Sequence, residues 1–481
     1  MQLIWLRSDL RVHDNTALAW AMERGPTLAV YVISPRQWMS HDDAASKVDF
    51  WLRNLVVLKT ALSALNVPLL IVHADTWDEA PAVLLDLCKK HAINSVHVNE
   101  EYGINETRRD AAVDFALSSV GIHFQSHLDQ LFFKPGTVLT KSGGYFKVFS
   151  QFRKTCYTRL HHGVPPQVRL PSKQQALNIP SDNIPEQANG FPTPPEALRN
   201  LWPAGEEEAR RRLETFADGQ IEHYLDERDF PAKPGTSQLS AYLAAGVISP
   251  RQCLHAALRS NQGEFETGNA GSITWINELL WREFYKHVLT GFPRVSRHRA
   301  FRPDTEAVKW RHAPDDLQAW QQGRTGFPIV DAAMRQLLET GWMHNRLRMV
   351  VAMFFSKNLL LDWRDGERFF MQHLIDGDLA ANNGGWQWSS STGTDSSPYF
   401  RIFNPLSQSA RFDPQGVFIK HWVPELAGLS KQDVHSPVVQ GGLFGDADYP
   451  APIVDLKSSR ERALYAFRSL PHLQTSGESH E

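Results

Sequence analysis

The chain has 481 residues, a formal net charge of −3 at pH 7 and a pI near 6.7. This length exceeds one ordinary hydrophobic core and allows two or three domains. The near-neutral charge argues against a surface covered in basic residues for nucleic acid, but it allows a local basic groove. No apolar run reaches the roughly 18 residues of a membrane span. The first residues, MQLIWLRSDLR, place charges where a secretory signal needs apolar residues. We therefore expect a cytoplasmic protein without a membrane segment.

Cysteine and tryptophan usage narrows the chemistry. Cys88, Cys156 and Cys253 lie far apart in the sequence, which predicts buried small side chains rather than a disulfide framework or a metal site. The chain also has 15 tryptophans. A large aromatic core explains such a number, and so does a pocket whose indoles stack on a flat ligand. Composition alone favours the core.

The first 130 residues alternate between apolar strands and amphipathic helices. Strands are predicted at Leu3–Leu6, Leu28–Ile33, Leu69–His73 and Ser95–Val98, with a helix at Ala45–Leu65. This alternation is typical of a doubly wound parallel sheet, so we predict an α/β domain over residues 1–130. Neither GxGxxG nor GxxxxGK[ST] occurs, so those two phosphate-binding motifs are not predicted to operate.

The sequence pattern changes twice in the rest of the chain. Eight prolines lie between Val164 and Pro195, which indicates a stiff surface connector, and we assign residues 131–201 to an interdomain linker. From about Trp202 the pattern is helical, which predicts an all-α domain over residues 202–470. Helices are expected at Gly205–Ala217, Ser272–Thr290, Pro328–Leu338, Met343–Leu360 and Gly366–Leu374. Residues 471–481 form a polar tail that we expect to be disordered from about Thr475.

One predicted helix carries an unusual face. In SITWINELLWREFYKHVLT, residues Trp275, Glu278, Trp281, Arg282 and Tyr285 share roughly one side. Rings together with a carboxylate and a guanidinium suit a base-sized ligand, which stacks on the rings and bonds through its edge. The alternative is a solvated amphipathic face with an ordinary Glu278–Arg282 pair.

Three other motifs are less specific. GWMHNRLRM contains Arg346, which suits a contact with a phosphate. The alternative is that this motif is the start of a helix with ordinary surface arginines. In DGDLAANNGGWQW, Asn382 and Asn383 suit a heteroaromatic edge; we rank a cofactor pocket above a structural turn and a metal last. GTSQLS has hydroxyls before a helix, which suit a phosphate or an N-cap. Because GxSxG and HExxH are absent, hydrolase and zinc chemistry are not predicted, and no metal is expected.

Long ordered segments then give a resemblance. The chain resembles the photolyase/cryptochrome family over roughly residues 1–470, and most of all bacterial class I cyclobutane pyrimidine dimer photolyases of the folate type. The segments that carry it are WLRSDLRVHDN (Trp5–Asn15), GTSQLSAYLAAGVISPRQ (Gly235–Gln252), WINELLWREFY (Trp275–Tyr285), TGFPIVDAAMRQLLETGWMHNRLRM (Thr325–Met349) and DGDLAANNGGWQWSSSTGTDSSPYFRIFNP (Asp376–Pro405).

The resemblance implies a reduced FAD in the helical domain. Its phosphate side would be held by Tyr224, Thr236, Ser237, Gln238, Leu239 and Ser240, with Gln238 where the family commonly has arginine. The flavin side would be surrounded by Trp275, Arg348, Asp376, Gly377, Asp378 and Asn382, with Asn382 beside flavin N5. Trp386, Trp363 and Trp310 match the chain of tryptophans that reduces photoexcited flavin.

The resemblance also implies a DNA site and a reaction. Trp281 and Trp388 match the indoles that flank a flipped pyrimidine dimer. Glu278, Arg282, Asn345 and Met349 match its polar and thioether contacts, and Arg228, Arg346 and Arg401 match phosphate contacts. The implied activity is light-driven opening of cyclobutane dimers in double-stranded DNA by an electron from excited reduced FAD, with base flipping. Enzymes for (6-4) lesions resemble each other in carrying paired histidines where this chain has His344–Asn345, and a histidine at Met349.

Several alternatives stay open. They are a blue-light photoreceptor (cryptochrome), a single-strand-specific photolyase, and a non-catalytic DNA-binding module rich in tryptophan. The implied antenna is 5,10-methenyltetrahydrofolate, because Asn105 and Glu106 match its contacts in folate-type enzymes. Arg297 stands where that group has lysine, and the two cations differ in geometry, so a deazaflavin is the other candidate. We expect a monomer.

Overall fold

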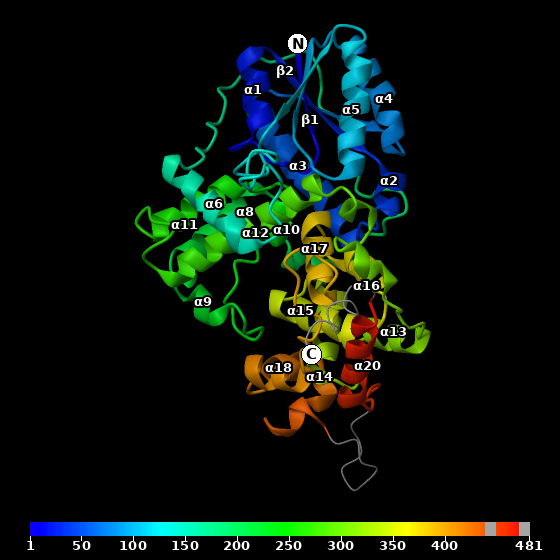
Figure 1. Cartoon of the computed structure of the whole chain (residues 1–481). Helices are drawn as coiled ribbons and strands as arrows, with labels where there is room; N and C mark the ends of the chain where they lie inside the picture. The colour runs from blue at the N-terminus through cyan, green and yellow to red at the C-terminus, as the bar shows by residue number, and fades with distance from the viewer. Residues whose placement is uncertain (438–448, 471–481) are drawn as a thin grey trace. The chain divides into compact units, whose positions relative to one another are not determined.

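The computed structural model of the chain describes residues 1–437 and 449–470 (Figure 1). The expected tail at 471–481 lies outside the described residues. Contacts divide the chain into two compact units. Unit 1 contains Met1–Leu225, Ser237–Pro293 and Ile375–Ala380, and unit 2 contains Asp226–Thr236, Arg294–Leu374 and Ala381–Glu481. Unit 1 extends across both predicted domain boundaries, at residues 130 and 201. The division into antenna domain, linker and helical domain therefore stays a prediction.

Unit 1 contains a five-stranded parallel sheet in the order β3-β2-β1-β4-β5. The strands are β1 (Gln2–Leu6), β2 (Thr27–Ile33), β3 (Leu69–His73), β4 (Ser95–Asn99) and β5 (His123–His127). Helix α1 (Thr16–Arg24) lies on one side, and α4 (Ala80–Lys90) and α5 (Ile104–Ser118) lie on the other (Figure 1). The strand order reverses between β1 and β4, and the predicted doubly wound α/β fold is confirmed.

The strands form where apolar runs can be buried on both faces. All seven residues of β2 are buried, as expected of a central parallel strand. Strand β5 was not predicted, because its sequence HFQSH is polar and only partly buried. β5 is an edge strand that pairs with β4 alone. Its other edge has no neighbouring strand, and polar residues are common in such edge strands.

The proline-rich connector covers the opposite edge of the sheet. Residues 163–195 contain no helix or strand. Asp182 donates its main-chain N–H to the Leu69 carbonyl at 2.8 Å and accepts from the Ile71 N–H at 2.9 Å, so the connector lies along β3. The wider linker predicted over 131–201 is not irregular throughout, because it contains helices α6 (Phe149–His162) and α7 (Glu196–Leu201). Helix α6 packs against α12 (Ala270–Gly291), which the local pattern of polar residues did not indicate.

Among the remaining helices of unit 1, α11 (Pro250–Ser260) packs directly against α12. The others are α2 (Pro35–Ser40), α3 (Ala45–Ala64), α8 (Glu206–Ala217) and α10 (Ser240–Ala244), with 3₁₀ turns η1 (Trp77–Glu79) and η2 (Gln220–His223). Helix α9 (Tyr224–Glu227) begins in unit 1 and ends in unit 2. A capping box between Ser249 and Gln252 fixes the start of α11, because each side chain satisfies a main-chain N–H of the other.

Unit 2 is helical. Its helices are α13 (Pro314–Gln321), α14 (Pro328–Thr340), α15 (Asn345–Met353), α16 (Trp363–His373), α18 (Pro405–Phe412), α19 (Val417–Trp422) and α20 (Leu456–Arg468); α17 (Leu379–Ser390) crosses into it from unit 1. Short 3₁₀ turns are η3 (Val295–Arg297), η4 (Pro303–Ala307), η6 (Pro424–Leu426) and η7 (Asp433–His435). Its core surrounds α14, α15 and Trp320.

One helix prediction in unit 2 is wrong. The expected helix Met343–Leu360 ends at Met353 and continues as a π-helical turn, η5 (Phe354–Asn358). This turn buries Lys357, whose Nζ donates to Ser391 Oγ at 2.7 Å and lies 3.9 Å from the Phe467 ring centroid. Leu360 then adopts a positive φ of 52°, which ends the helical path.

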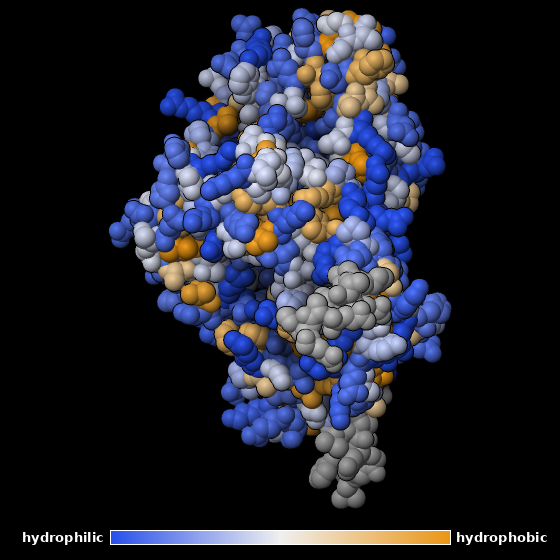
Figure 2. All heavy atoms as spheres, in the orientation of Figure 1, coloured by the Kyte–Doolittle hydropathy of each residue, from blue (hydrophilic) through white to orange (hydrophobic). Residues whose placement is uncertain are grey.

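Further expectations from the sequence concern membrane spans, metal sites and cysteines. Within the described residues, no helix is long and apolar enough to cross a membrane, and no group of three His, Cys, Asp or Glu side chains forms a metal cluster. Cys88, Cys156 and Cys253 are buried free thiols, as predicted. Hydrophilic residues predominate on the face shown in Figure 2, with hydrophobic residues in small groups.

Candidate active site

Helix α12 presents the aromatic and polar face that the sequence predicts. Asn269 caps its N-terminus by accepting from the Ser272 N–H. The Trp281 ring stacks on Phe149 of α6, with centroids 3.7 Å apart and planes 13° apart. Trp281 also meets Tyr285 at 5.6 Å. Because Phe149 backs one face of the indole, the ring is held in a fixed orientation and offers a rigid stacking surface.

Two contacts with a distant segment orient α12. Nη1 of Arg282 donates to the Gln130 carbonyl at 2.6 Å. The carboxylate of Glu283, which is buried, accepts from the main-chain N–H groups of Phe132 and Phe133 at 2.9 and 2.8 Å. These bonds fix the guanidinium of Arg282 and the rotation of the helix. Glu278 is half-buried one turn earlier.

Residues expected at the FAD divide between the two units. In unit 1, Phe216 joins two of them: its ring lies 5.6 Å from Tyr224 and 5.0 Å from Trp275. Asp378 forms an ion pair with Lys286 of α12, with Nζ and Oδ2 2.7 Å apart. Lys286 was not predicted, because only the fold brings these two motifs together.

The GTSQLS segment places its hydroxyl residues around the start of α10 but not at the N-cap position. The N-cap of α10 is Leu239, whose side chain makes no capping hydrogen bond. Gln238 adopts a positive φ of 49°, which costs a non-glycine residue energy and often marks a functional site. Its Oε1 accepts from Arg212 at 3.5 Å. Gly235 packs so closely on Glu227 that a Cβ would lie 2.8 Å from its carbonyl oxygen.

In unit 2 the amide pair Asn382–Asn383 is fixed on α17 by Glu367. Asn382 Nδ2 donates to the main-chain carbonyl of Glu367 at 3.0 Å, and Asn383 Nδ2 donates to its carboxylate at 2.9 Å. Gln387 then donates to Asn383 Oδ1 at 2.8 Å. The motif is therefore a turn followed by an ordered helix, whose amides are held in place.

FAD fits the chemistry of these residues. Hydroxyls and main-chain N–H groups of Thr236, Ser237 and Ser240 suit its pyrophosphate. Amides, carboxylates and indoles suit the polar edge and the face of an isoalloxazine ring.

The predicted DNA residues of unit 2 lie on and around α15. His344 caps the helix, because its Nδ1 accepts from the Arg346 N–H at 3.2 Å. Asn345 is exposed and Met349 is half-buried one turn later. Arg346 forms an ion pair with Asp229, and Arg348 Nε donates to the Met343 carbonyl at 2.8 Å. Arg401 is exposed, and Arg228 and Trp388 are half-buried.

The three tryptophans predicted to reduce photoexcited flavin belong to or pack against one hydrophobic core. Trp363 and Trp386 are buried members of it, and Trp310 packs against it. Trp386 also meets Trp320 at 6.0 Å and Phe370 at 5.0 Å. The structure therefore surrounds Trp386 with aromatic rings that the sequence did not single out.

A second group of residues lies where the strand order reverses, after β1 and β4. Asn105 Nδ2 and His41 Nε2 are 3.0 Å apart, and the His41 ring meets Trp77 edge-on at 4.8 Å. Arg109 lies 4.4 Å from the Trp77 ring centroid. His41 and Trp77 were not predicted, because they come from the segments after β2 and β3. Such switch points are the usual ligand sites of doubly wound sheets.

Charges in this second group are tightly coupled. Burial opposes ionisation of Glu101, but Arg7 and Arg109 outweigh it and lower its pKa to about 2. Burial, together with the negative charge of Glu101, raises the pKa of Glu106 to about 7. Glu106 therefore changes charge near neutral pH, at the start of α5.

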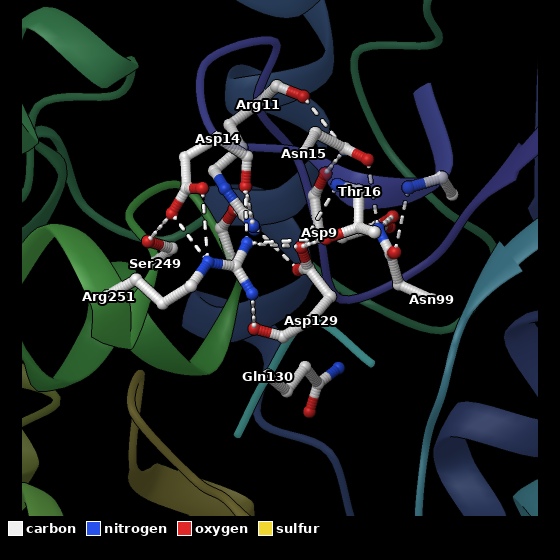
Figure 3. Close-up of polar contacts among 12 residues, drawn as sticks. Asp9, Arg11, Asp14, Asn15, Thr16, Asn99, Asp129, Gln130, Ser249 and Arg251 are labelled. Atoms are coloured by element: carbon white, nitrogen blue, oxygen red, sulfur yellow. Dashed lines mark hydrogen bonds and ion pairs between the residues drawn. The ribbon is translucent and has the colours of Figure 1, made fainter. Parts of the chain in front are cut away.

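The motif Trp5–Asn15 forms a buried polar hub (Figure 3). Asp129 accepts from Arg11 at 2.6 Å and from Arg251 of α11 at 2.8 Å. Arg251 also pairs with Asp14 at 3.0 Å. Burial opposes ionisation of Asp129, but the two arginines outweigh it and lower its pKa. The hub ties the end of β1 to α11 within unit 1, so this motif is structural at these positions.

Fold and site together define a flavoprotein with a parallel-sheet domain and a helical FAD-binding region. Family models described as DNA photolyase and as the FAD binding domain of DNA photolyase match residues 2–172 and 275–469. A deoxyribodipyrimidine photo-lyase of Escherichia coli (strain K12) is 43% identical over 473 residues, which are 97% of this chain and 98% of that relative. The chain belongs to the DNA photolyase family.

Solved structures agree. A bacterial class III photolyase from Agrobacterium tumefaciens is 34% identical with a TM-score of 0.84 and covers 98% of each chain. A cryptochrome of Synechocystis sp. PCC6803 is 27% identical with the same TM-score of 0.84, covering 97% of this chain and 99% of that one. The fold is thus shared equally with a repair enzyme and a cryptochrome.

Proposed function

We propose that this chain is a deoxyribodipyrimidine photo-lyase, which uses light and reduced FAD to open cyclobutane pyrimidine dimers in double-stranded DNA. The observation that carries the proposal is the face of α12. There Trp281 is stacked on Phe149, and Arg282 is fixed on Gln130. The name of the Escherichia coli relative supports it over almost the whole chain.

The residues proposed to hold FAD fall into two groups. On the phosphate side they are Tyr224, Thr236, Ser237, Gln238, Leu239 and Ser240; on the flavin side they are Trp275, Arg348, Asp376, Gly377, Asp378 and Asn382. When bound in its reduced form, FAD supplies the electron that opens the cyclobutane ring under light. The chain's own residues supply position, charge and exclusion of water.

The dimer is proposed to leave the DNA stack and to stack on the indoles of Trp281 and Trp388. Unstacking a damaged base costs little, and two indoles replace the lost stacking. Arg282 and Asn345 donate hydrogen bonds to the polar edges of the dimer, and Met349 contacts its apolar surface. Glu278 is proposed to stabilise the negative charge that develops on the dimer by donating a hydrogen bond, a role that requires the protonated form of its carboxyl group.

Three arginines are proposed to bind the DNA backbone. Arg228, Arg346 and Arg401 would contact phosphates, which fix the position of the duplex without reading its sequence. Each contact releases counterions, so affinity falls as salt rises.

Trp386, Trp363 and Trp310 are proposed to relay electrons between the protein surface and its interior. Their shared hydrophobic core supports this role, because it keeps water away from two of the three indoles.

We propose 5,10-methenyltetrahydrofolate as the antenna, near Asn105, Glu106 and His41, with a deazaflavin as the alternative. The pairing of Asn105 with His41 and the nearby Trp77 ring support a flat heteroaromatic ligand there.

Residues 1–130 would form the antenna domain, 131–201 the linker and 202–470 the FAD-binding domain. We further propose a monomeric cytoplasmic protein.

A blue-light photoreceptor is the second candidate, because the Synechocystis cryptochrome has the same TM-score as the photolyase. A repair assay separates the two. Reduced, flavin-loaded protein is illuminated with duplexes that carry one cyclobutane thymine dimer or one (6-4) lesion. The proposal expects repair of the first only. Repair of neither substrate favours the photoreceptor, and repair of the second only means that the lesion is misassigned.

A further inference from the structure

An acidic residue occupies one edge of a guanidinium proposed to bind DNA. Asp229 lies in the turn after α9, and its carboxylate binds Arg346 with both oxygens: Nε to Oδ1 at 3.2 Å and Nη2 to Oδ2 at 2.7 Å. The side chain of Asp229 is 32% exposed and that of Arg346 is 19% exposed, so solvent still reaches the pair. Both residues belong to unit 2.

Two further contacts hold Arg346. Its Cζ lies 4.6 Å from the centroid of the Phe412 ring, which in turn meets Phe230 at 6.3 Å. Its main-chain N–H donates to His344 Nδ1. Burial lowers the pKa of His344 to about 4, so this imidazole is neutral and accepts a hydrogen bond at neutral pH. The guanidinium therefore has a defined plane and a defined direction.

The pair limits how Arg346 can bind a phosphate. Nε and Nη2 form one of the two guanidinium edges that can bind an oxyanion with two hydrogen bonds, and Asp229 occupies it. A phosphate must either bind at the other edge, through Nη1 and the second N–H of Nη2, or displace the carboxylate. In both cases the negative charge of Asp229 lies beside the phosphate and weakens its attraction.

We propose that Asp229 is a positioning residue that fixes Arg346 and restrains its affinity for the phosphates of undamaged DNA. The inference rests on the proposed function, in which Arg346 contacts the DNA backbone. Arg411, whose Cζ lies 5.1 Å from the same Phe412 ring, and Arg228 add positive charge around the pair. Asp229 offsets part of this charge, and so keeps binding to ordinary duplex weak.

The test measures binding of an undamaged duplex by fluorescence anisotropy from about 50 to about 200 mM salt. Asp229→Asn is compared with Arg346→Gln, with the double variant and with Glu23→Gln. The last is a matched control: it makes the same change in net charge at a residue whose side chain is 76% exposed. Asp229→Ser serves as a second variant if Asp229→Asn does not fold, and thermal melts monitor folding.

Asp229→Asn is expected to tighten binding about three- to tenfold at the lowest salt and to steepen the slope of log K against log salt by up to about one. The double variant is expected to match Arg346→Gln, because Asp229 acts only through Arg346. Glu23→Gln is expected to behave as wild type.

Three different results would overturn the proposal. If Arg346→Gln weakens binding but Asp229→Asn and Asp229→Ser leave affinity and slope unchanged, the restraint is absent although the arginine binds DNA. If Arg346→Gln itself leaves binding unchanged, the phosphate contact in the proposed function fails, and the inference fails with it. A tightening as large in Glu23→Gln would mean a general charge effect and would also contradict it.

Discussion

Gly366 of α16 lies directly against the indole of Trp386. A Cβ at this glycine would be 2.1 Å from Cη2 of the ring and 2.5 Å from Cζ3, far inside van der Waals contact. The backbone of α16 can approach the indole only because residue 366 has no side chain. Gly366 thus helps to fix the place of the first tryptophan in the proposed relay.

Gly366→Ala is expected to displace Trp386 and to slow light-driven reduction of bound flavin. Overpacking of this kind also costs about 1–3 kcal/mol of stability. The measurement is flavin photoreduction by absorbance, together with a urea titration.

Gly385→Ala is the matched control, since it makes the same substitution next to Trp386 where a Cβ meets no atom within 4 Å. It is expected to keep or raise stability, because alanine favours helix over glycine. Equal stability and equal photoreduction in Gly366→Ala and wild type would show that Trp386 is not held by this contact.

The second prediction concerns Glu278. Glu278→Ala removes the proposed hydrogen bond to the dimer and is expected to lower repair per absorbed photon about two- to tenfold, the value of one hydrogen bond. Glu278→Gln, which keeps a donor, is expected to lose less. Repair of a defined dimer under measured blue light checks this, with the exposed Glu207→Gln as control. If both Glu278 variants repair as wild type does, the carboxyl has no part in the reaction.

The third prediction is a pH dependence set by Glu106. Its folded pKa of about 7 lies above the ordinary glutamate value, so the unfolded chain holds fewer protons at this site. The contribution of Glu106 to stability therefore falls as pH rises from about 4.5 to about 7. Glu106→Gln should flatten the pH dependence of the unfolding free energy in this window. An unchanged profile in the variant would mean that Glu106 titrates normally.

The fourth prediction tests the polar hub. Asp129→Asn leaves Arg11 and Arg251 buried without their shared carboxylate, which is expected to cost about 3–5 kcal/mol. Because the folded pKa of Asp129 is lowered, its contribution is present above the ordinary aspartate pKa and is lost in strong acid. Urea unfolding near neutral pH measures the cost. A loss below about 1 kcal/mol, as for an exposed pair, would contradict the account of the hub.

The sequence predicted the parts of the fold that local patterns encode. Four strands and the helix α12 were predicted to within two residues, because each has a clear apolar period. β5 was missed because a polar edge strand has no such period. Helix α6 was missed because prolines further along suggested one continuous linker, whereas α6 packs on α12.

The residues of the candidate site were predicted through motifs, but their partners were not. Phe149 behind Trp281, Lys286 beside Asp378 and Asp229 on Arg346 are all more than 90 residues away from the groups they hold. No spacing rule relates such positions, since only the folded chain brings them into contact. The one helix predicted too long, Met343–Leu360, fails at the π-turn that buries Lys357, where tertiary packing overrides the helical period.

The most direct test of the central claim is repair of a duplex with one cyclobutane thymine dimer by purified, flavin-loaded and reduced protein. Parallel samples are kept in blue light and in darkness, and intact thymines are measured by chromatography. The account predicts restored thymines in the light, none in the dark, and a strong loss of light-dependent repair in Trp281→Ala. An equal yield in both conditions, or no repair in the light by the reduced protein, would contradict it.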